Sequence, residues 1–411
     1  MDSNPALCTA IAHRITTSPE RRITFAEYMD TVLYHPEHGY YSSNAVKLGF
    51  EGGDFFTSVH LGNDFGELLA EQFLQMWEIL GQPVTFSVVE MGAGQGLLAS
   101  HILNYCQQHY PAFFAAIEYV IVEKSPGLRQ EQQQRLQDFP IQWCNLAEIP
   151  PNSITGCFFS NELVDALPVH QFILEAGELR EIYVTTRKDR NKGDIAFLSL
   201  STSSSPSATP SFLSSFVEVT GEASTPRLVE YFNLVEIELT QGAYADGYRS
   251  EINLAALDWL SIVADRLRCG YVLTIDYGYP ASRYYNPRRS QGTLKCYYHH
   301  RHHDNPYVNI GQQDITAHVD FTALERWGDR CGLDKVGFTQ QALFLMALGL
   351  GSRIAALSHQ EQSISQLLQR RESLHELLNP LGLGGFGVLV QSKGLKEKAI
   401  SQPLKGLTVP E

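Results

Sequence analysis

The amino-acid sequence predicts an α/β fold built on a parallel, Rossmann-like sheet. Residues 83–169 alternate between buried-strand and helical patterns, and the alternation resumes within residues 251–394. A glycine-rich turn follows the first of these strands. Strands that are rich in β-branched and aromatic residues and alternate with helices are typical of a parallel sheet covered on both faces.

Residues 1–82 precede this sheet and show mainly helical patterns. Apolar spacing predicts helices in "FAEYMDTVLY" and "ELLAEQFLQMWEIL". The glycine-containing stretch between them, "EGGDFFTSVHLGNDFG", predicts a loop. We therefore expect an N-terminal helical segment that carries one long loop.

The first part of the sheet is predicted in residues 83–169. Strands are expected in "TFSVVEMGAG", "AAIEYVIVEKS", "IQWC" and "ITGCFFSNE". Helices expected in "LLASHILNYCQQ" and "LRQEQQQRL" lie between the first three. Parallel strands need such crossover connections, so the order supports a doubly wound unit.

Residues 170–250 interrupt the pattern. The short alternating segments "ELREIYVTT", "DIAFLSLS" and "LVEIEL" predict an inserted β-rich segment, and "STSSSPSATPS" predicts a solvated loop within it. The α/β pattern returns in residues 251–394 with helices in "LAALDWLSIVADRL", around "DFTALERWGDRCG" and within 360–379, and with strands in "GYVLTIDYG" and "GFGVLVQSK". Residues 395–411 are expected to form a C-terminal tail.

The charge balance and the cysteines limit the classes of partner and compartment. The 31 Lys and Arg residues and the 45 Asp and Glu residues give a net charge of 31 − 45 = −14. This charge disfavours nucleic acid and anionic membrane surfaces as partners. No apolar run approaches the roughly 20 residues of a membrane helix. Seven cysteines form no CxxC pair, which indicates buried, reduced thiols. Because "MDSNPALCTAIAHRITTSPERR" matches neither a signal nor a transit peptide, we expect a cytoplasmic protein.

The stretch "VVEMGAGQGLLAS" places Glu90 before three glycines, Gly92, Gly94 and Gly96. Such a turn lets a ligand approach the backbone, and the second strand ends at Glu123, where a carboxylate can accept both ribose hydroxyls of an adenosine. NAD, S-adenosylmethionine and a plain glycine turn all fit this outline. We favour S-adenosylmethionine, because Glu90 would repel a pyrophosphate and the order G-A-G-Q-G departs from G-x-G-x-x-G.

The fourth predicted strand ends in polar residues. Asn161 and Glu162 follow its apolar run, and Asp165 comes three residues later. Ionised carboxylates that are buried without partners cost several kcal/mol, so these groups are either solvated at a sheet edge or bind a ligand. Asp276 ends the fifth strand in the same way, and it either faces an acceptor or orders the turn.

The chain resembles the MidA-like class I methyltransferases in several uncommon strings. They occur in the order "ITFAEYMDTVLYHPEHGYY", "GGDFFTS", "VVEMGAGQG", "SNELVDALPVHQF", "TIDYG" and "QQDITAHVDF". The family includes the mitochondrial complex I assembly factor that methylates an arginine. The resemblance implies a class I methyltransferase sheet, S-adenosylmethionine as cofactor, and an arginine of a protein substrate, such as a respiratory-complex subunit, as acceptor.

The resemblance also implies roles for individual residues. Cofactor contacts are implied for Glu90, Gly92, Ala93, Gly94, Gly96, Glu123 and Asn161, and for the closing-loop residues Gly53, Asp54, Thr57 and Ser58. A protonated guanidinium needs carboxylates for bidentate docking. Glu162 leads for this catalytic role, with Asp165 or Glu251 second. Asp165 equally fits a cap of the turn before Pro168.

Other functions and partners stay open at this point. The alternatives are a non-catalytic complex-assembly factor that retains the fold, a small-molecule methyltransferase and a nicotinamide oxidoreductase. No metal is expected, because adjacent histidines on an extended chain point to opposite faces and no ligand set completes His299, His300, His302 and His303. As partners we expect a protein substrate with an acceptor arginine, no nucleic acid and no membrane insertion, and we leave a homodimer open.

Overall fold

The structure, a computed structural model, describes residues 3–42, 58–187, 216–239, 242–299, 301–357 and 364–410. "DIAFLSLS" and "STSSSPSATPS" lie outside these residues. The chain divides into two units, each assembled from separate stretches of sequence. Unit 1 comprises Met1–Lys47, Ala166–Ala255 and Ala281–His318, and unit 2 comprises Leu48–Asp165, Ala256–Pro280 and Val319–Glu411.

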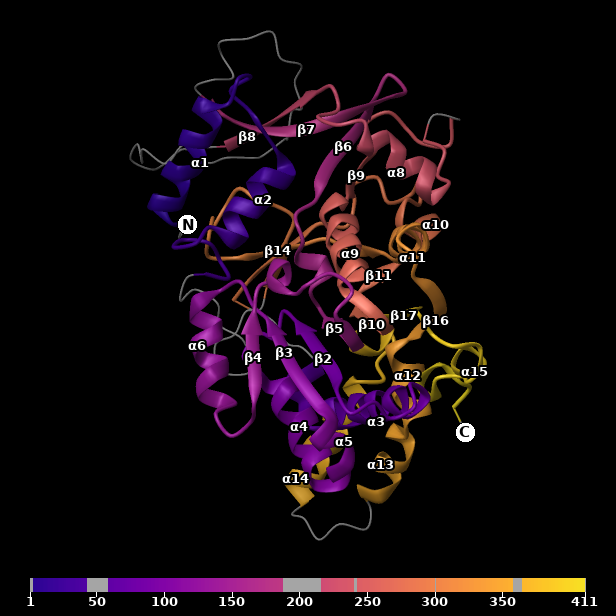
Figure 1. The fold of residues 1–411 in the computed structure, drawn as a ribbon. Helices are drawn as coiled ribbons and strands as arrows, with labels where there is room; N and C mark the ends of the chain where they lie inside the picture. The colour runs from indigo at the N-terminus through magenta and orange to yellow at the C-terminus, as the bar shows by residue number, and fades with distance from the viewer. Residues whose placement is uncertain are drawn as a thin grey trace. The chain divides into compact units, whose positions relative to one another are not determined.

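Unit 2 is built on a seven-stranded sheet with the order β16-β17-β10-β5-β2-β3-β4 (Figure 1). β2, β3, β4, β5 and β10 are parallel, β17 is antiparallel to β10, and β16 is antiparallel to β17. The bounds are β2 (Phe86–Met91), β3 (Ile117–Val122), β4 (Ile141–Cys144), β5 (Ile154–Asn161), β10 (Leu267–Asp276), β16 (Asp334–Gln340) and β17 (Gly387–Lys393). The parallel strands follow the doubly wound order 3-2-1-4-5, which confirms the predicted Rossmann-like fold class.

Helices cover both faces of this sheet. Val88, Cys157 and Leu273 share a hydrophobic core with residues of α3 and α4. On the opposite side of β2, the Trp259 indole N–H of α9 lies 3.3 Å from the Met91 sulfur. The helices of unit 2 are α3 (Asp64–Ile79), α4 (Leu97–His109), α5 (Pro111–Ala116), α6 (Pro126–Arg135), α9 (Leu254–Arg266), α11 (Phe321–Arg330), α12 (Gln341–Leu348), α13 (Leu350–Ala356), α14 (Ile364–Glu376) and α15 (Glu397–Ile400). A short pair, β11 (Gly278–Tyr279) and β15 (Val319–Asp320), precedes α11, and the Asp320 side chain caps α11 by accepting the N–H groups of Thr322 and Ala323.

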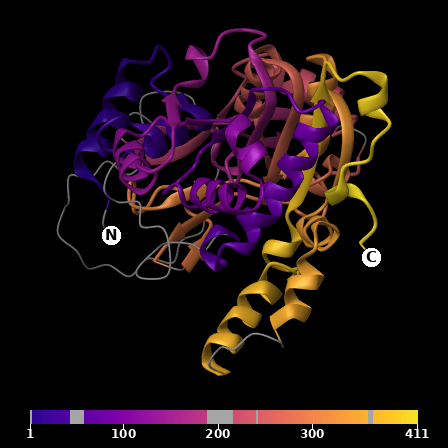
Figure 2. The same ribbon diagram turned by 60° about the horizontal axis from the view of Figure 1, so that its bottom comes forward.

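α13 and α14 extend away from the sheet of unit 2, where Figure 2 shows them as two gold helices. Arginines attach them to the start of α3. Arg353 bonds Asp64 at 2.9 Å and also pairs with Glu67, and Arg370 lies 3.4 Å from Asp64. The two acidic residues of these ion pairs come shortly after η1 (Ser58–Leu61) in the sequence. The ion pairs therefore fix the segment that follows the predicted closing loop.

The C-terminal segment also packs on α3. The N–H of Gly406 donates to Gln72 Oε1 at 3.0 Å, and the N–H of Lys405 donates to Gln75 Oε1 at 2.7 Å. Leu404 and Gln72 are buried. Residues 404–406 are therefore part of the packed unit.

Unit 1 contains a five-stranded antiparallel sheet, which confirms the predicted β-rich insertion. The order is β1-β7-β6-β9, and β8 pairs with β7. Its strands are β1 (Ile23–Thr24), β6 (His170–Glu175), β7 (Glu178–Thr186), β8 (Phe216–Gly221) and β9 (Arg249–Ile252). A second sheet joins β12 (Lys295–Tyr298), β13 (Arg301–His303) and β14 (Asp314–Thr316). The helices are α1 (Pro5–Thr17), α2 (Phe25–Tyr34), α8 (Arg227–Val235) and α10 (Ala281–Tyr284).

The strand predicted in "LVEIEL" is wrong. Leu234 and Val235 are the last residues of α8, which ends where Glu236 adopts the left-handed conformation with φ 57°. The buried residues Leu228, Tyr231 and Val235 recur at helical spacing. This period of 3.6 prevails over the local alternation of apolar and acidic residues.

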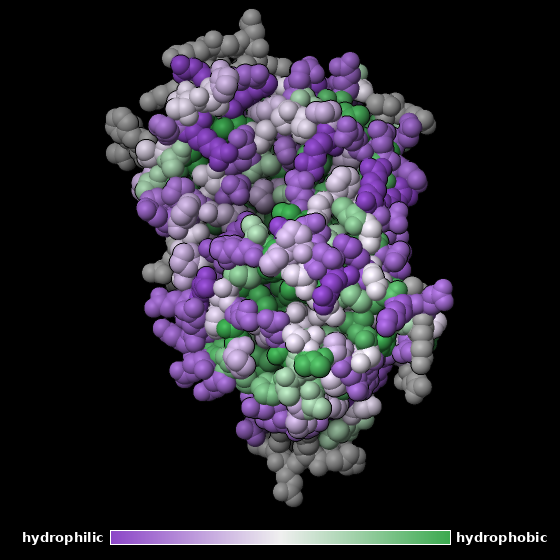
Figure 3. Space-filling model, viewed as in Figure 1, coloured by the Kyte–Doolittle hydropathy of each residue, from purple (hydrophilic) through white to green (hydrophobic). Residues whose placement is uncertain are grey.

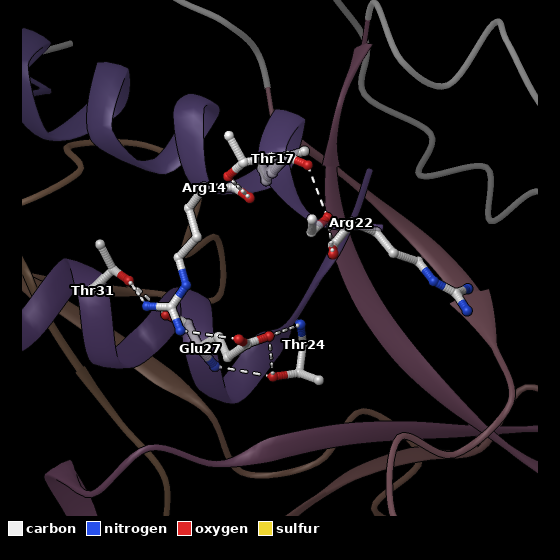
Figure 4. Close-up of polar contacts among 8 residues, drawn as sticks. Arg14, Thr17, Arg22, Thr24, Glu27 and Thr31 are labelled. Carbon is white, nitrogen blue, oxygen red and sulfur yellow. Dashed lines mark hydrogen bonds and ion pairs between the residues drawn. The ribbon is translucent and has the colours of Figure 1, made fainter. Parts of the chain in front are cut away.

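The N-terminal helices of unit 1 are joined by polar contacts (Figure 4). Arg14 of α1 donates to Glu27 at 2.9 Å and to Thr31 at 3.2 Å in α2. The Glu27 carboxylate also accepts the N–H of Thr24, while the Thr24 hydroxyl accepts the N–H of Glu27 at 3.1 Å. Together these form a capping box that starts α2 directly after β1.

Thr24→Ala is expected to lower the free energy of unfolding by about 1 kcal/mol, because it removes the hydroxyl that caps α2. Urea unfolding of the variant and the wild type measures the difference. Thr9→Ala is a matched control, because the Thr9 hydroxyl is exposed and bonds only within its own helix, to the Pro5 carbonyl. Equal losses in both variants would contradict a specific capping role.

Hydrophilic side chains cover most of the face shown in Figure 3, and hydrophobic residues are visible in smaller areas. Among the residues that the structure describes, no helix is long and apolar enough to cross a membrane.

Candidate functional site

The order of the unit 2 sheet reverses between β2 and β5. In open α/β sheets, ligands bind outside the carboxyl ends of the strands at such a switch point. The turn after β2 is the glycine turn, Asn161 is the last residue of β5, and the turn after β5 carries Glu162 and Asp165. The topology therefore brings the two predicted groups of site residues to one edge of one sheet.

The glycine turn requires its glycines. Gly92, Gly94 and Gly96 have φ of 73°, 52° and 77°, a region that L side chains rarely adopt. Ala93 lies between them and is buried. Gly96 is the N-cap of α4, so the glycine turn leads directly into this helix.

The glycine turn packs against the turn after β5. A Cβ added at Gly92 would lie 2.8 Å from Cδ1 of Leu163. Leu163 follows Glu162 in sequence, so a side chain at position 92 would displace the Leu163 side chain beside the acidic residues. Both the positive φ of Gly92 and this close contact therefore disfavour any other residue at position 92.

Glu90 lies inside β2, just before the glycine turn, and is 3% exposed. The Tyr119 hydroxyl of β3 donates to its Oε2 at 2.7 Å. Burial raises the pKa of Glu90 to about 7, and the nearby Glu123 adds to the increase, while the bond from Tyr119 opposes it. This carboxyl group therefore changes its charge near neutral pH.

Glu90→Gln is expected to gain stability relative to the wild type as the pH rises from 4.5 to about 7. The folded state holds the Glu90 proton more tightly than the unfolded state does, so wild-type stability falls with pH in this window, whereas an amide does not titrate. Urea unfolding at several pH values without cofactor measures the difference. Exposed Glu78→Gln is the control, and a pH-independent difference for Glu90→Gln would contradict the buried titration.

Glu123 follows β3, and both of its oxygens are held by the protein. The N–H of Ser125 donates to Oε1 at 2.8 Å, and Nε2 of Gln132 donates to Oε2 at 3.1 Å. Burial raises the pKa of Glu123, and these two donors oppose the increase. The carboxylate is therefore fixed in orientation at the tip of the second strand.

Asn161 ends β5, and Glu162 follows it with φ 54°. The N–H of Glu162 donates to the Ile275 carbonyl at 2.9 Å, and Nδ2 of Asn161 donates to Glu162 Oε1 at 3.2 Å. Oδ1 of Asn161 is buried and accepts no hydrogen bond from the described residues. A buried acceptor of this kind indicates that its donor comes from outside the described residues.

Asp276, the last residue of β10, orders the turn after β5. Its Oδ2 accepts the N–H of Val164 at 2.9 Å and that of Asp165 at 3.3 Å, and its Oδ1 accepts the N–H of Tyr277 at 2.9 Å. Burial, followed by the charges of Asp165 and Glu162, raises the pKa of Asp276 well above its usual range. Asp276 therefore orders the turn, as one of its two predicted roles requires, and holds it beside two other carboxyl groups.

The remaining predicted residues fall in several places. Gly53, Asp54 and Thr57 lie outside the described residues. Ser58 is buried in unit 2, where its hydroxyl accepts a bond from Gln341 Nε2 at 3.1 Å.

Glu251 lies in unit 1 and is 1% exposed. Its Oε2 accepts the Thr293 N–H at 2.8 Å and the Thr293 hydroxyl at 3.1 Å, and the Tyr284 hydroxyl lies 3.4 Å away. These contacts tie the loop before β12 to β9.

The histidine-rich stretch forms the β12–β13 hairpin. His302 pairs with Tyr297 and His303 pairs with Cys296, while His300 lies outside the described residues. Within the described part of the chain, no three His, Cys, Asp or Glu side chains are grouped so that they could hold a metal ion.

The comparisons with known proteins can now be set against this geometry. Residues 68–339, more than half of the chain, match the family described as "Putative S-adenosyl-L-methionine-dependent methyltransferase". The chain belongs to this family. The match spans the glycine turn, the acidic turn after β5 and Asp276.

Relatives extend the likeness beyond the matched region. The mitochondrial protein arginine methyltransferase NDUFAF7 of Danio rerio is 29% identical over 96% of this chain and 90% of its own. The protein of the same name from Homo sapiens is 28% identical over 88% and 78%. A crystal structure of a superfamily member from Burkholderia thailandensis with bound S-adenosyl-homocysteine is 29% identical, covers 97% of this chain and 95% of its own, and has a TM-score of 0.78.

These findings confirm the predicted methyltransferase and its cofactor, S-adenosylmethionine. The residues of this methyltransferase fit that cofactor. The buried Asn161 Oδ1 needs a donor, and the glycine turn is exposed at Gly92 and half-buried at Gly94, so its backbone can meet a ligand there. S-adenosylmethionine provides donors in its amino group and ribose hydroxyls.

The sequence reasoning missed three residues that shape the site of this methyltransferase. They are Gln132, which contacts Glu123, Leu163, which packs on Gly92, and Tyr119, which bonds Glu90. Tyr119 could have been found, because it lies in the predicted strand beside β2, two residues before Ile121, which pairs with Glu90. Gln132 lies within the run "RQEQQQR", where nothing distinguishes it from the exposed glutamines around it.

Proposed function

We propose that this methyltransferase transfers a methyl group to an arginine side chain of a protein. The observation that carries the proposal is the group of three carboxyl side chains, Glu162, Asp165 and Asp276, at the carboxyl ends of β5 and β10 beside the glycine turn. An arginine guanidinium stays protonated and docks on carboxylates through paired hydrogen bonds. The cationic acceptor would relieve the repulsion among these groups. The relatives named protein arginine methyltransferase support the same acceptor.

In this proposal the chain chiefly positions the acceptor. When bound, S-adenosylmethionine supplies a methyl group whose bond to sulfur breaks, with the electron pair going to sulfur, as the bond to the acceptor nitrogen forms. Glu162 holds the guanidinium at the required distance and accepts the proton that the nitrogen loses. Asp165 contributes negative charge, and Asp276 keeps the turn in place. Alignment of the reacting groups supplies much of the acceleration in such displacements.

The cofactor contacts are part of the proposal. Glu123 would hold the ribose hydroxyls, and Glu90 and Asn161 would face the amino-acid part of the cofactor. Backbone groups of Gly92, Ala93, Gly94 and Gly96 would line its path, and the loop with Gly53, Asp54, Thr57 and Ser58 would close over it. For Glu251 we propose only a supporting role in unit 1, because its carboxylate is engaged by Thr293 and Tyr284.

We further propose that the protein works in a reducing compartment such as the cytoplasm, since all seven cysteines are free thiols. The two arginine methyltransferases named above are mitochondrial proteins. As acceptor we propose testing respiratory-complex subunits first. A homodimer and the exclusion of nucleic acid stay expectations, the latter based on the net charge of −14.

An NMR titration with two blocked tripeptides, Gly-Arg-Gly and Gly-Lys-Gly, tests the acceptor preference in the presence of S-adenosyl-homocysteine. The arginine peptide is expected to bind more tightly, because only a guanidinium can bond two carboxylate oxygens in parallel. Glu162→Gln is expected to remove the preference. Equal binding of both peptides to the wild type would argue against an arginine acceptor.

A further inference from the structure

Gln132 is a buried glutamine on a helix of exposed ones. α6 carries Gln130, Gln133 and Gln134 on its exposed surface, whereas Gln132 is 0% exposed. Burial of an amide is unfavourable unless its donors and acceptor are all engaged. The position of Gln132 therefore calls for a reason beyond helix formation.

Both ends of the Gln132 amide are engaged, and its orientation follows from its partners. The Trp143 indole N–H of β4, which can only donate, lies 3.1 Å from Oε1. Nε2 must then face the two acceptors, the Gly94 carbonyl at 2.8 Å and Glu123 Oε2 at 3.1 Å. One side chain thus joins the glycine turn, the carboxylate after β3 and the strand β4.

Gln132 also packs on the glycine turn. A Cβ added at Gly96 would lie 3.4 Å from Gln132 Cγ. Ser125 links Glu123 to the start of α6. Its N–H donates to Glu123 Oε1, and its hydroxyl accepts the N–H of Leu128. Glu123, α6 and the glycine turn therefore form one hydrogen-bonded group.

We propose that Gln132 is a positioning residue for the cofactor: it fixes the orientation of the Glu123 carboxylate and ties it to the glycine turn at Gly94. The inference rests on the proposed role of Glu123 in holding the ribose, and it does not depend on the identity of the acceptor. A carboxylate held on one oxygen by Ser125 and on the other by Gln132 is prepared for a pair of hydroxyl donors. Without Gln132 only the bond from Ser125 would hold the carboxylate, and ordering it would reduce the binding energy.

The donor atom of Gln132 matters for charge as well as for position. An N–H that donates to the ionised form of Glu123 favours that form, which opposes the effect of burial on its pKa. In Gln132→Glu a second carboxylate would face Glu123 and the Gly94 carbonyl. The variant would then bind the cofactor well only while Glu123 and the carboxyl group at position 132 share a proton. Cofactor binding by the wild type requires no shared proton.

Calorimetry with S-adenosyl-homocysteine between pH 6 and 8.5 tests this inference. Gln132→Leu is expected to weaken binding by about tenfold at every pH, in line with the loss of a hydrogen bond to a charged group. Gln132→Glu is expected to bind progressively more weakly as the pH rises, a trend that loss of packing alone would not produce. Gln133→Leu changes an exposed glutamine of the same helix and should leave binding unchanged.

A second measurement keeps the inference testable if Gln132→Leu folds poorly. The indole ¹⁵N–¹H signal of Trp143, assigned with Trp143→Phe, should shift in the folded wild type when S-adenosyl-homocysteine is added, because Trp143 bonds Gln132 directly. Wild-type affinity in Gln132→Leu, or parallel pH profiles for Gln132→Glu and the wild type, would overturn the proposal. Unchanged binding by Glu123→Ala would instead remove the assigned role of Glu123.

Discussion

Glu162→Gln is expected to slow methyl transfer to an arginine acceptor by about 100- to 1,000-fold, a loss typical for one group that stabilises charge in an enzyme site. The amide keeps the size of the side chain but loses the negative charge and the ability to accept a proton. Since the Glu162 N–H bond to the Ile275 carbonyl involves only the backbone, the left-handed turn should persist. S-adenosyl-homocysteine binding should therefore stay within a few-fold of the wild type.

The rate is measured with labelled S-adenosylmethionine at saturating cofactor, and calorimetry checks cofactor binding in the same preparation. Glu372→Gln, an exposed substitution in α14, is the matched control for the loss of one carboxylate. Undiminished transfer by Glu162→Gln would remove Glu162 from its proposed role and direct attention to Asp165.

Gly92→Val is expected to weaken S-adenosyl-homocysteine binding by at least about 100-fold and to lower stability as well. A β-branched residue at φ 73° is strained by roughly 1–3 kcal/mol. In addition its Cβ would lie 2.8 Å from Cδ1 of Leu163, so the Leu163 side chain would have to move. Calorimetry for binding and urea unfolding for stability measure the two consequences separately.

Gly81→Val separates backbone strain from the contact at the site. Gly81 has φ 85°, and a Cβ there would meet nothing within 4 Å. It should therefore lose stability without losing cofactor binding. Adding Leu163→Ala to Gly92→Val should recover part of the stability. Binding by Gly92→Val within threefold of the wild type would contradict the proposed position of the cofactor.

The parallel part of the fold could be predicted because its signals are local. Each parallel strand combines a short apolar run with a polar or glycine-containing end; these strands are β2, β3, β4, β5 and β10. In the helices between them, apolar residues recur every three to four positions. β16 was not predicted. Its sequence "DKVGFTQ" is mostly exposed at the edge of the sheet, and its pairing with β17 joins residues far apart in the chain.

The sequence predicted which strand ends carry the site residues, but it did not predict the contacts among them. The glycine turn and Glu162 could be placed at one sheet edge, since parallel strands end together. The contacts that hold the glycine turn and the turn after β5 in place could not be predicted from the sequence. Asp276 bonds the turn from more than a hundred residues away, and Gln132 reaches Gly94 from another helix. Such contacts depend on the path of the chain, as does the assignment of Glu251 to unit 1.

The central claim is that the acceptor is an arginine of a protein. The most direct measurement incubates the purified protein with methyl-labelled S-adenosylmethionine and a cell lysate, hydrolyses the labelled protein fraction and separates its methylated amino acids. The proposal predicts label in methylated arginine, and a large loss of this label with Glu162→Gln. Label in methylated lysine, or only in low-mass products outside the protein fraction, would contradict it.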